Sequence, residues 1–132
     1  MSKRNIIYTF HHMGIPTTEQ RENEKYSSTF KMYTSGGEQG PFHIQYHRFE
    51  EDSPLHPLLK TKVHVAFKVD SIDEAIVGKK VLLEPYYPFK GFRVAAIEVD
   101  GCPIELIETN LSEEEIWSPS SYKNSIIYPK ES

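Results

Sequence analysis

Residues 64–76 read HVAFKVDSIDEAI and combine a strand pattern with a helix signal. Its opening segment, VHVAFKV over 63–69, combines valines with a phenylalanine in a way that is typical of strands. Asp70 or Ser71 then supplies an N-cap for a short helix that reaches Ile76. This stretch therefore predicts a strand followed by a short helix.

Strand signals continue on both sides of this stretch. Downstream, Asp100–Gly101 is a typical hairpin turn between apolar runs, and the aromatic, Pro/Gly-containing segment 85–91 predicts a loop. Upstream, the polar segment 17–26 predicts a helical turn opened by Thr17 or Thr18. The predicted strands cover residues 5–12, 29–34, 42–49, 79–84, 92–99 and 103–108, with a polar link over 50–61 and a polar tail over 110–132.

Composition limits the functions that the chain can have. Its 132 residues carry 15 basic and 19 acidic side chains, which gives a formal charge of −4. Because no basic cluster extends beyond Lys3 and Arg4, the chain lacks the positively charged surface expected of a nucleic-acid-binding protein. No apolar run approaches the roughly 20 residues of a membrane span, and the N-terminus lacks the apolar centre of a signal peptide. The single cysteine, Cys102, suits a reducing compartment. We therefore expect one soluble, cytoplasmic domain.

The chain contains two similar halves. HMGIPTTE begins at His12 and HVAFKVDS begins at His64, and each has a histidine, an apolar, a small and an apolar residue before a helix cap. Later in each half, FHIQYHRFE surrounds Gln45 and CPIELIETN surrounds Glu105. Each half therefore predicts a strand, a short helix and two or three further strands. We expect the halves to pair into one sheet system with a shared cleft.

The four repeated positions, His12, Gln45, His64 and Glu105, carry side chains that bind metals. Two imidazoles, a carboxylate and an amide oxygen suit a borderline divalent transition metal, and strands would hold them rigidly. Each residue also has a simpler interpretation: hydrogen-bonded histidines, a surface glutamine, and a glutamate on the solvent side of an alternating strand. The repeat gives one reason for all four, while residue types alone leave both interpretations open.

Three motifs resemble the vicinal-oxygen-chelate superfamily, which includes glyoxalase I, bleomycin-resistance proteins, epimerases and extradiol dioxygenases. They are HHMGI, HVAFKVDSIDEAI and VDGCPIELIE, and the resemblance covers about residues 5–109. It implies an α+β fold of paired βαβββ modules, about 5–50 and 62–109, that form a curved, cup-like mixed sheet around a metal ion. Residues 110–132 form a polar C-terminal tail outside it. Relatives commonly form dimers, so a homodimer is implied as well.

By this resemblance the metal ligands are His12, Gln45, His64 and Glu105, and the metal is a divalent ion of Zn, Ni, Co, Mn or Fe. His11 is the alternative to His12, but strand alternation sends neighbouring side chains to opposite faces, so we expect only one of them to face the site. The HMGI/HVAF alignment favours His12. The first half is short, with 33 positions from His12 to Gln45 against 41 from His64 to Glu105, so its helix and second strand are expected to be trimmed. VDGCPIEL also lacks the DPDG-type turn of many relatives.

Gln45 is the departure that most affects the chemistry, because glyoxalase-type relatives often carry a carboxylate there. An amide does not exchange a proton at neutral pH, so a reaction needs Glu105 as a displaceable base or another group. Alternation in FHIQYHRF places His43, Gln45 and His47 on one face. His47 is therefore a candidate catalytic base, or a replacement for Gln45 as ligand, and the alternative is a polar, hydrated wall.

The segment YYPFKGFR over 86–93 is a candidate substrate site. Tyr87 and its aromatic neighbours can line an apolar pocket, where Lys90 or Arg93 would meet an anionic group of the substrate. The alternative is a loop that packs its aromatic rings into the core.

Three functions on a small-molecule substrate fit these features. The first is a metal-dependent, glyoxalase-like lyase or isomerase that stabilises the enediolate of a small carbonyl or acyl substrate. The second uses His12, His64 and Glu105 as a two-histidine, one-carboxylate face for Fe(II), as in extradiol dioxygenases. The third is a binding protein of the bleomycin-resistance kind, without chemistry. The fold alone does not choose among them.

Overall fold

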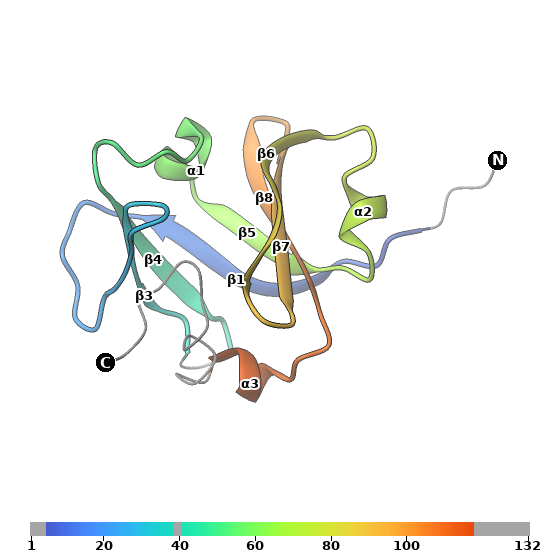
Figure 1. Cartoon of the computed structure of the whole chain (residues 1–132), viewed down its shortest axis with the longest axis horizontal. Coiled ribbons are helices and arrows are strands. Elements are labelled where there is room, and N and C mark those ends of the chain that lie inside the picture. Colours follow the sequence, from blue (N-terminus) through green and yellow to red (C-terminus); the bar gives the residue numbers. More distant parts are fainter. Residues whose placement is uncertain (1–4, 39–40, 118–132) are drawn as a thin grey trace.

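The computed structural model describes residues 5–38 and 41–117. They form an α+β fold in which eight strands make one curved mixed sheet, with short helices around it (Figure 1). The strand order is β2-β3-β4-β1-β5-β8-β7-β6. Within these residues, no helix has the length and apolar character that crossing a membrane requires.

The stretch that opens the second half folds as predicted. Strand β5 (His64–Lys68) leads into helix α2 (Ile72–Ala75). Of the two expected caps, Ser71 is the one used, because its hydroxyl accepts a hydrogen bond from the N–H of Glu74 at 3.2 Å. The short helix is thus fixed at its first turn, directly after a central strand.

Strands β6 (Lys80–Phe89), β7 (Phe92–Val99) and β8 (Cys102–Thr109) complete the second half as an antiparallel meander. The turn between β7 and β8 places Asp100 and Gly101 at φ of 51° and 80°, the left-handed pair that a two-residue hairpin turn needs. The predicted loop over 85–91 is wrong for residues 85–89, because the aromatic residues there pair with β7 despite register shifts and extend β6 to Phe89. Residues 90–91 form the turn.

The first half consists of strands without a helix. Residues 17–24 contain only bends and turns, so the predicted helical turn over 17–26 is wrong. Its polar residues offer no apolar face to bury, and helical turns this short depend on such packing. The strands are β1 (Thr9–Pro16), β2 (Lys25–Ser27), β3 (Met32–Gly36) and β4 (Ile44–Phe49), and helix α1 (Pro57–Thr61) lies within the link to the second half.

The two halves meet where β1 and β5 run antiparallel at the middle of the sheet. In each half the first strand pairs in parallel with the last, β1 with β4 and β5 with β8. Strands β4, β1, β5 and β8, two from each half, therefore lie side by side at the middle of the sheet (Figure 1).

Apolar residues cover both faces of β7 and β8. On one face, Leu106 packs with α2 in a cluster of Val69, Ile72, Ala75, Ala95, Ile97 and Leu106. On the other, Ile107 packs in a cluster of Ala66, Phe89, Phe92, Val94, Ile107 and Ile116. Ile116 is only 4% exposed. It belongs to helix α3 (Glu113–Trp117), which lies in the segment predicted as a polar tail. The rest of that segment, residues 118–132, lies outside the described residues.

Candidate metal centre

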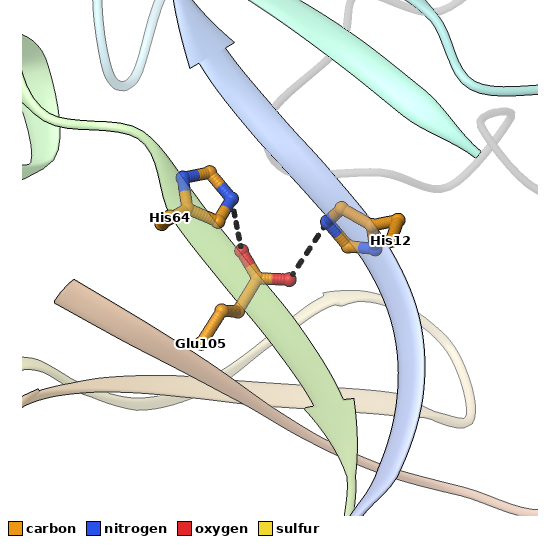
Figure 2. A group of neighbouring side chains, drawn as sticks. All are labelled: His12, His64 and Glu105. Atoms are coloured by element: carbon orange, nitrogen blue, oxygen red, sulfur yellow. Dashed lines mark ion pairs between the residues drawn. The ribbon is translucent and has the colours of Figure 1, made fainter. Parts of the chain in front are cut away.

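Three of the four predicted ligands meet on adjacent strands. His12 on β1, His64 on β5 and Glu105 on β8 converge, and Figure 2 shows both imidazole rings directed at the Glu105 carboxylate. Nε2 of His12 lies 3.4 Å from Oε2 of Glu105, and Nε2 of His64 lies 3.5 Å from Oε1. The ligand atoms all lie within 4.8 Å of one another, so the group could hold a metal ion.

Strand register explains why these three side chains meet. The small, fully buried Ala66 pairs with His12 on one side and Glu105 on the other, so the three residues form one row across β1, β5 and β8. His64 lies two positions before Ala66 on β5 and therefore points to the same face. Two histidines and one carboxylate are thus brought together by backbone pairing.

The fourth predicted ligand lies in the neighbouring row. Gly14 pairs with His64 on β5 and with Gln45 on β4, so Gln45 and His64 flank a residue that has no side chain. Gln45 lines the same cavity as His12, His64 and Glu105. Gln45 is therefore a wall residue of the same cavity, beside the three clustered side chains.

Burial sets the charges of these groups. It lowers the pKa of His64 to about 4 and holds the pKa of His12 well below 6.5, so both imidazoles are neutral, the form that binds metals. Burial also raises the pKa of Glu105 to about 7, because its carboxylate faces the cavity rather than bulk water. A divalent cation would offset this cost by pairing with the buried negative charge.

One buried atom in the cluster lacks a partner. Nε2 of His64 makes no hydrogen bond within the described residues, although the residue is only 8% exposed. Buried polar atoms are almost always hydrogen-bonded, so an unsatisfied ring nitrogen requires an explanation. A nitrogen lone pair that points into a group of ligand atoms fits a metal ion, and the donor set of two imidazoles and a carboxylate suits Zn, Co, Ni, Mn or Fe.

His47 lies beside the cluster and shares the cavity with Gln45. It is buried, its ring stacks on His64 at 5.4 Å between centroids, and its Nδ1 lies 3.0 Å from Oγ1 of Thr34. Its Nε2 has no hydrogen-bond partner among the described residues. Burial lowers the pKa of His47 to about 3, so the ring is neutral. His43 precedes β4, and its ring stacks on that of Trp117 with the centroids 4.7 Å apart.

The prediction that only one residue of the His11–His12 pair faces the site is wrong. Both line the cavity, and both are buried, at 3% and 5% exposure. The pairing of β1 with β5 steps from Phe10–Phe67 to His12–Ala66, so β1 has one extra residue at His11. A β-bulge of this kind interrupts alternation and turns two successive side chains to the same face.

The cluster opens into a cavity of ≈ 140 Å³. An apolar cavity of about 150 Å³ is large enough to hold benzene, so this one has room for a small organic molecule. Its polar lining gathers around the predicted metal ligands, and the rest is aromatic and aliphatic, including Phe30, Phe49, Leu83, Tyr86, Phe92 and Trp117. No lysine or arginine among residues 5–38 and 41–117 lines it.

The structure places the three predicted substrate-binding residues away from this cavity lining. Tyr87 is 56% exposed, whereas its neighbours Tyr86 and Pro88 line the cavity. Lys90 is exposed in the turn between β6 and β7. Arg93 pairs with Asp73 of α2 at 2.9 Å, because alternation along β7 turns it to the opposite side of the strand from Phe92.

Two of the lining residues that the sequence did not predict contact histidines of the site. Thr34 on β3 holds His47, and Trp117 on α3 stacks on His11 with ring centroids 5.5 Å apart. Thr34 lies outside every motif that the sequence offers, and only the pairing of β3 with β4 places it beside His47. Trp117 lies outside both repeated halves, so its position depends on how α3 packs onto the sheet.

Comparison with known proteins assigns no family to this chain. No protein-family model matches it, and a search of curated proteins finds no similar sequence. The short motifs in the first and second halves therefore stay a resemblance, and the function must be inferred from the cluster and its cavity.

Proposed function

We propose that this protein is a divalent-metal-dependent enzyme of the vicinal-oxygen-chelate type, with lyase or isomerase activity on a small carbonyl or acyl substrate. The observation that carries this proposal is the His12–His64–Glu105 group, with its unsatisfied Nε2 on His64, at the wall of an apolar cavity. The strand pairings β1–β4 and β5–β8 support two βαβββ-like modules, the first without its helix.

His12, His64 and Glu105 would hold the metal, with Gln45 as a fourth ligand. The ion would supply a positive charge beside two adjacent substrate oxygens, which stabilises an enediolate. The protein must then supply a base, and two groups face the cavity for this purpose. Glu105 is a carboxylate with a raised pKa, and His47 presents a neutral Nε2 without a partner in the described structure.

The lining also supports a class of substrate. The polar groups gather around the metal ligands, so the adjacent oxygens of the substrate would lie there. Aromatic and aliphatic side chains form the remaining wall, and no cationic side chain of the described residues lines it to pair with an anionic group. We therefore propose an uncharged substrate with an apolar or aromatic body.

A second candidate is an Fe(II) oxygenase. The three clustered ligands are two histidines and one carboxylate, which is the ligand set of non-haem iron enzymes that activate oxygen. In that case Gln45 would line the cavity without binding the metal. The two candidates differ in the metal that supports activity and in whether oxygen is consumed.

The test is metal-dependent proton exchange on an uncharged aromatic α-hydroxyketone, 2-hydroxyacetophenone, in D₂O. Apoprotein loaded with Zn²⁺, Ni²⁺, Co²⁺ or Mn²⁺ should exchange the hydrogens next to the carbonyl, as followed by NMR. Glu105→Gln should abolish the exchange. Glu98→Gln is the matched control, since Glu98 is also 24% exposed at its side chain but pairs with Lys80.

Two other outcomes would redirect the proposal. Oxygen uptake by the Fe(II) protein with catechol, without proton exchange, would favour the oxygenase. Absence of both activities in protein that binds metal and ligand would favour a binding protein without chemistry.

A further inference from the structure

The predicted metal ligand His12 has a second histidine behind it. Nδ1 of His11 lies 2.8 Å from Nδ1 of His12, while Nε2 of His12 faces Glu105. Nε2 of His11 in turn lies 3.1 Å from Oε1 of Glu113, the first residue of α3. Glu113, His11 and His12 thus form a row that runs from a half-exposed carboxylate to the candidate metal centre.

The proton positions along this row decide whether His12 can bind a metal. Two ring nitrogens 2.8 Å apart need one N–H and one lone pair between them. The carboxylate of Glu113 favours an N–H on Nε2 of His11, which leaves Nδ1 of His11 as an acceptor for the N–H on Nδ1 of His12. Nε2 of His12 then keeps its lone pair for the metal. In the reverse arrangement, Nε2 of His12 carries a proton and cannot be a ligand.

Two further contacts hold Glu113 near His11. Oε1 of Glu113 accepts a hydrogen bond from Nε1–H of Trp117 at 3.2 Å, and Oε2 lies 3.9 Å from Nζ of Lys68. The N–H direction of His11 is not aligned with Oε1 for a hydrogen bond, and the Glu113 side chain, 48% exposed, has room to turn toward it. The Trp117 ring stacks on His11 and keeps the imidazole in place.

We propose that His11 and Glu113 are positioning residues that fix the tautomer and ring orientation of His12 for metal binding. This inference rests on the proposed function, since it needs His12 to be a ligand. It adds that α3, which lies outside the two repeated halves, is part of the metal centre. Partners of ligating histidines typically change metal affinity by about 10–100-fold.

The test compares two His11 variants that separate hydrogen bonding from packing. His11→Gln keeps an acceptor and a donor but loses the ring, whereas His11→Phe keeps a ring for Trp117 but loses both nitrogens. Zn²⁺ affinity is measured by competition with a chromophoric chelator. We expect His11→Phe to bind Zn²⁺ about 10–100-fold more weakly and His11→Gln to stay within about threefold of the wild type.

The same measurement on α3 tests the outer end of the row. Glu113→Ala should weaken Zn²⁺ binding about tenfold, Glu113→Gln should retain most of it through its amide oxygen, and Glu114→Ala is the matched control on the same helix. The Co²⁺ absorption spectrum of each variant reports the geometry of the ligands, which a loss of stability alone would not change.

The outcomes separate this inference from the proposed function. If the wild type does not bind Zn²⁺, both fail. If the wild type binds and His64→Ala does not, but His11→Phe matches the wild type, only the positioning role is overturned. Long-range ¹H–¹⁵N NMR of the apoprotein gives a second test: we expect N–H on Nε2 of His11 and on Nδ1 of His12, and the reverse pattern would overturn the inference.

Discussion

The imidazole of His64 occupies the space where a side chain on Gly14 would stand. A Cβ atom at Gly14 would lie 2.5 Å from Nε2 of His64 and closer still to Cε1. The backbone of Gly14 has an ordinary negative φ, so the glycine serves to leave space rather than to allow an unusual conformation. The HHMGI motif therefore contributes both a candidate ligand, His12, and the gap into which the ring of a second candidate ligand, His64, fits.

Gly14→Ala should disturb the metal centre without removing a ligand. The new methyl group must push the His64 ring aside, at a cost of about 1–3 kcal/mol in unfolding free energy, and should lower Zn²⁺ affinity at least about tenfold. In a His64→Ala background the same substitution should cost almost nothing. Chemical denaturation of the four proteins gives this double-mutant cycle, and equal costs in both backgrounds would contradict the account.

Glu105→Gln should stabilise the apoprotein while it removes metal binding. Because the pKa of Glu105 is raised to about 7, its carboxylate is ionised at pH 8 and burial of that charge destabilises the fold. We expect a gain of about 2 kcal/mol at pH 8 and a smaller gain at pH 5, where the folded wild type is already protonated. Thermal unfolding at the two pH values measures this. A loss of stability at pH 8 would show that the carboxylate is well solvated.

Acid should destabilise the apoprotein through its buried neutral histidines. The pKa of His47 is about 3 in the fold against 6.5 for an exposed histidine, so the unfolded chain binds the extra proton as pH falls below 6.5. This stability is fully present above pH 6.5 and is lost toward pH 3, at about 1.4 kcal/mol per pH unit. Glu105 has the opposite effect on the free energy of unfolding, because its raised pKa makes protonation favour the fold as the pH falls. This contribution is the same in the wild type and in a His47 variant.

His47→Gln isolates that contribution. Between pH 6.5 and 5 the variant should lose about 2 kcal/mol less stability than the wild type, while the glutamine can still bond to Thr34. Urea denaturation across this pH range measures the difference. Parallel curves for the two proteins would mean that His47 is protonated in the fold.

Gln45→Glu should raise the affinity for a hard divalent ion such as Mn²⁺, because it adds a negative charge at the cavity wall. Calorimetric titration of both proteins compares the dissociation constants directly. Equal or weaker binding by the variant would place residue 45 outside the coordination sphere and would favour the iron-type ligand set of His12, His64 and Glu105.

Regular strands made much of the candidate site predictable. The pairing of β4 with β1 and β3 has no register shift, so alternation correctly placed Gln45 and His47 at the cavity wall. It failed for His43, which precedes β4, has a φ of 47° and does not line the cavity. The repeat selected His12, His64 and Glu105 from residues far apart in the sequence, and strand pairing brings them together.

The failures have local physical causes. Alternation misplaced His11 because a β-bulge, which depends on pairing between distant strands, is invisible in the sequence of β1 alone. The aromatic segment that contains Tyr87 was expected to be a loop, but its pairing with β7 makes it a strand, with Tyr87 outside the cavity lining. The position of Trp117 at the cavity likewise depends on how α3 packs onto the sheet, which no periodic pattern in the sequence indicates.

Elemental analysis of the purified protein, without a histidine tag or added metal, shows whether His12, His64 and Glu105 hold a metal ion. We expect a near-stoichiometric divalent transition metal in the wild type and its loss in His64→Ala, with the fold retained. His56→Asn, which removes a histidine outside the site and keeps a helix-capping side chain, should retain the metal. A wild type that stays metal-free on titration, or a His64→Ala variant with unchanged metal content, would contradict the account.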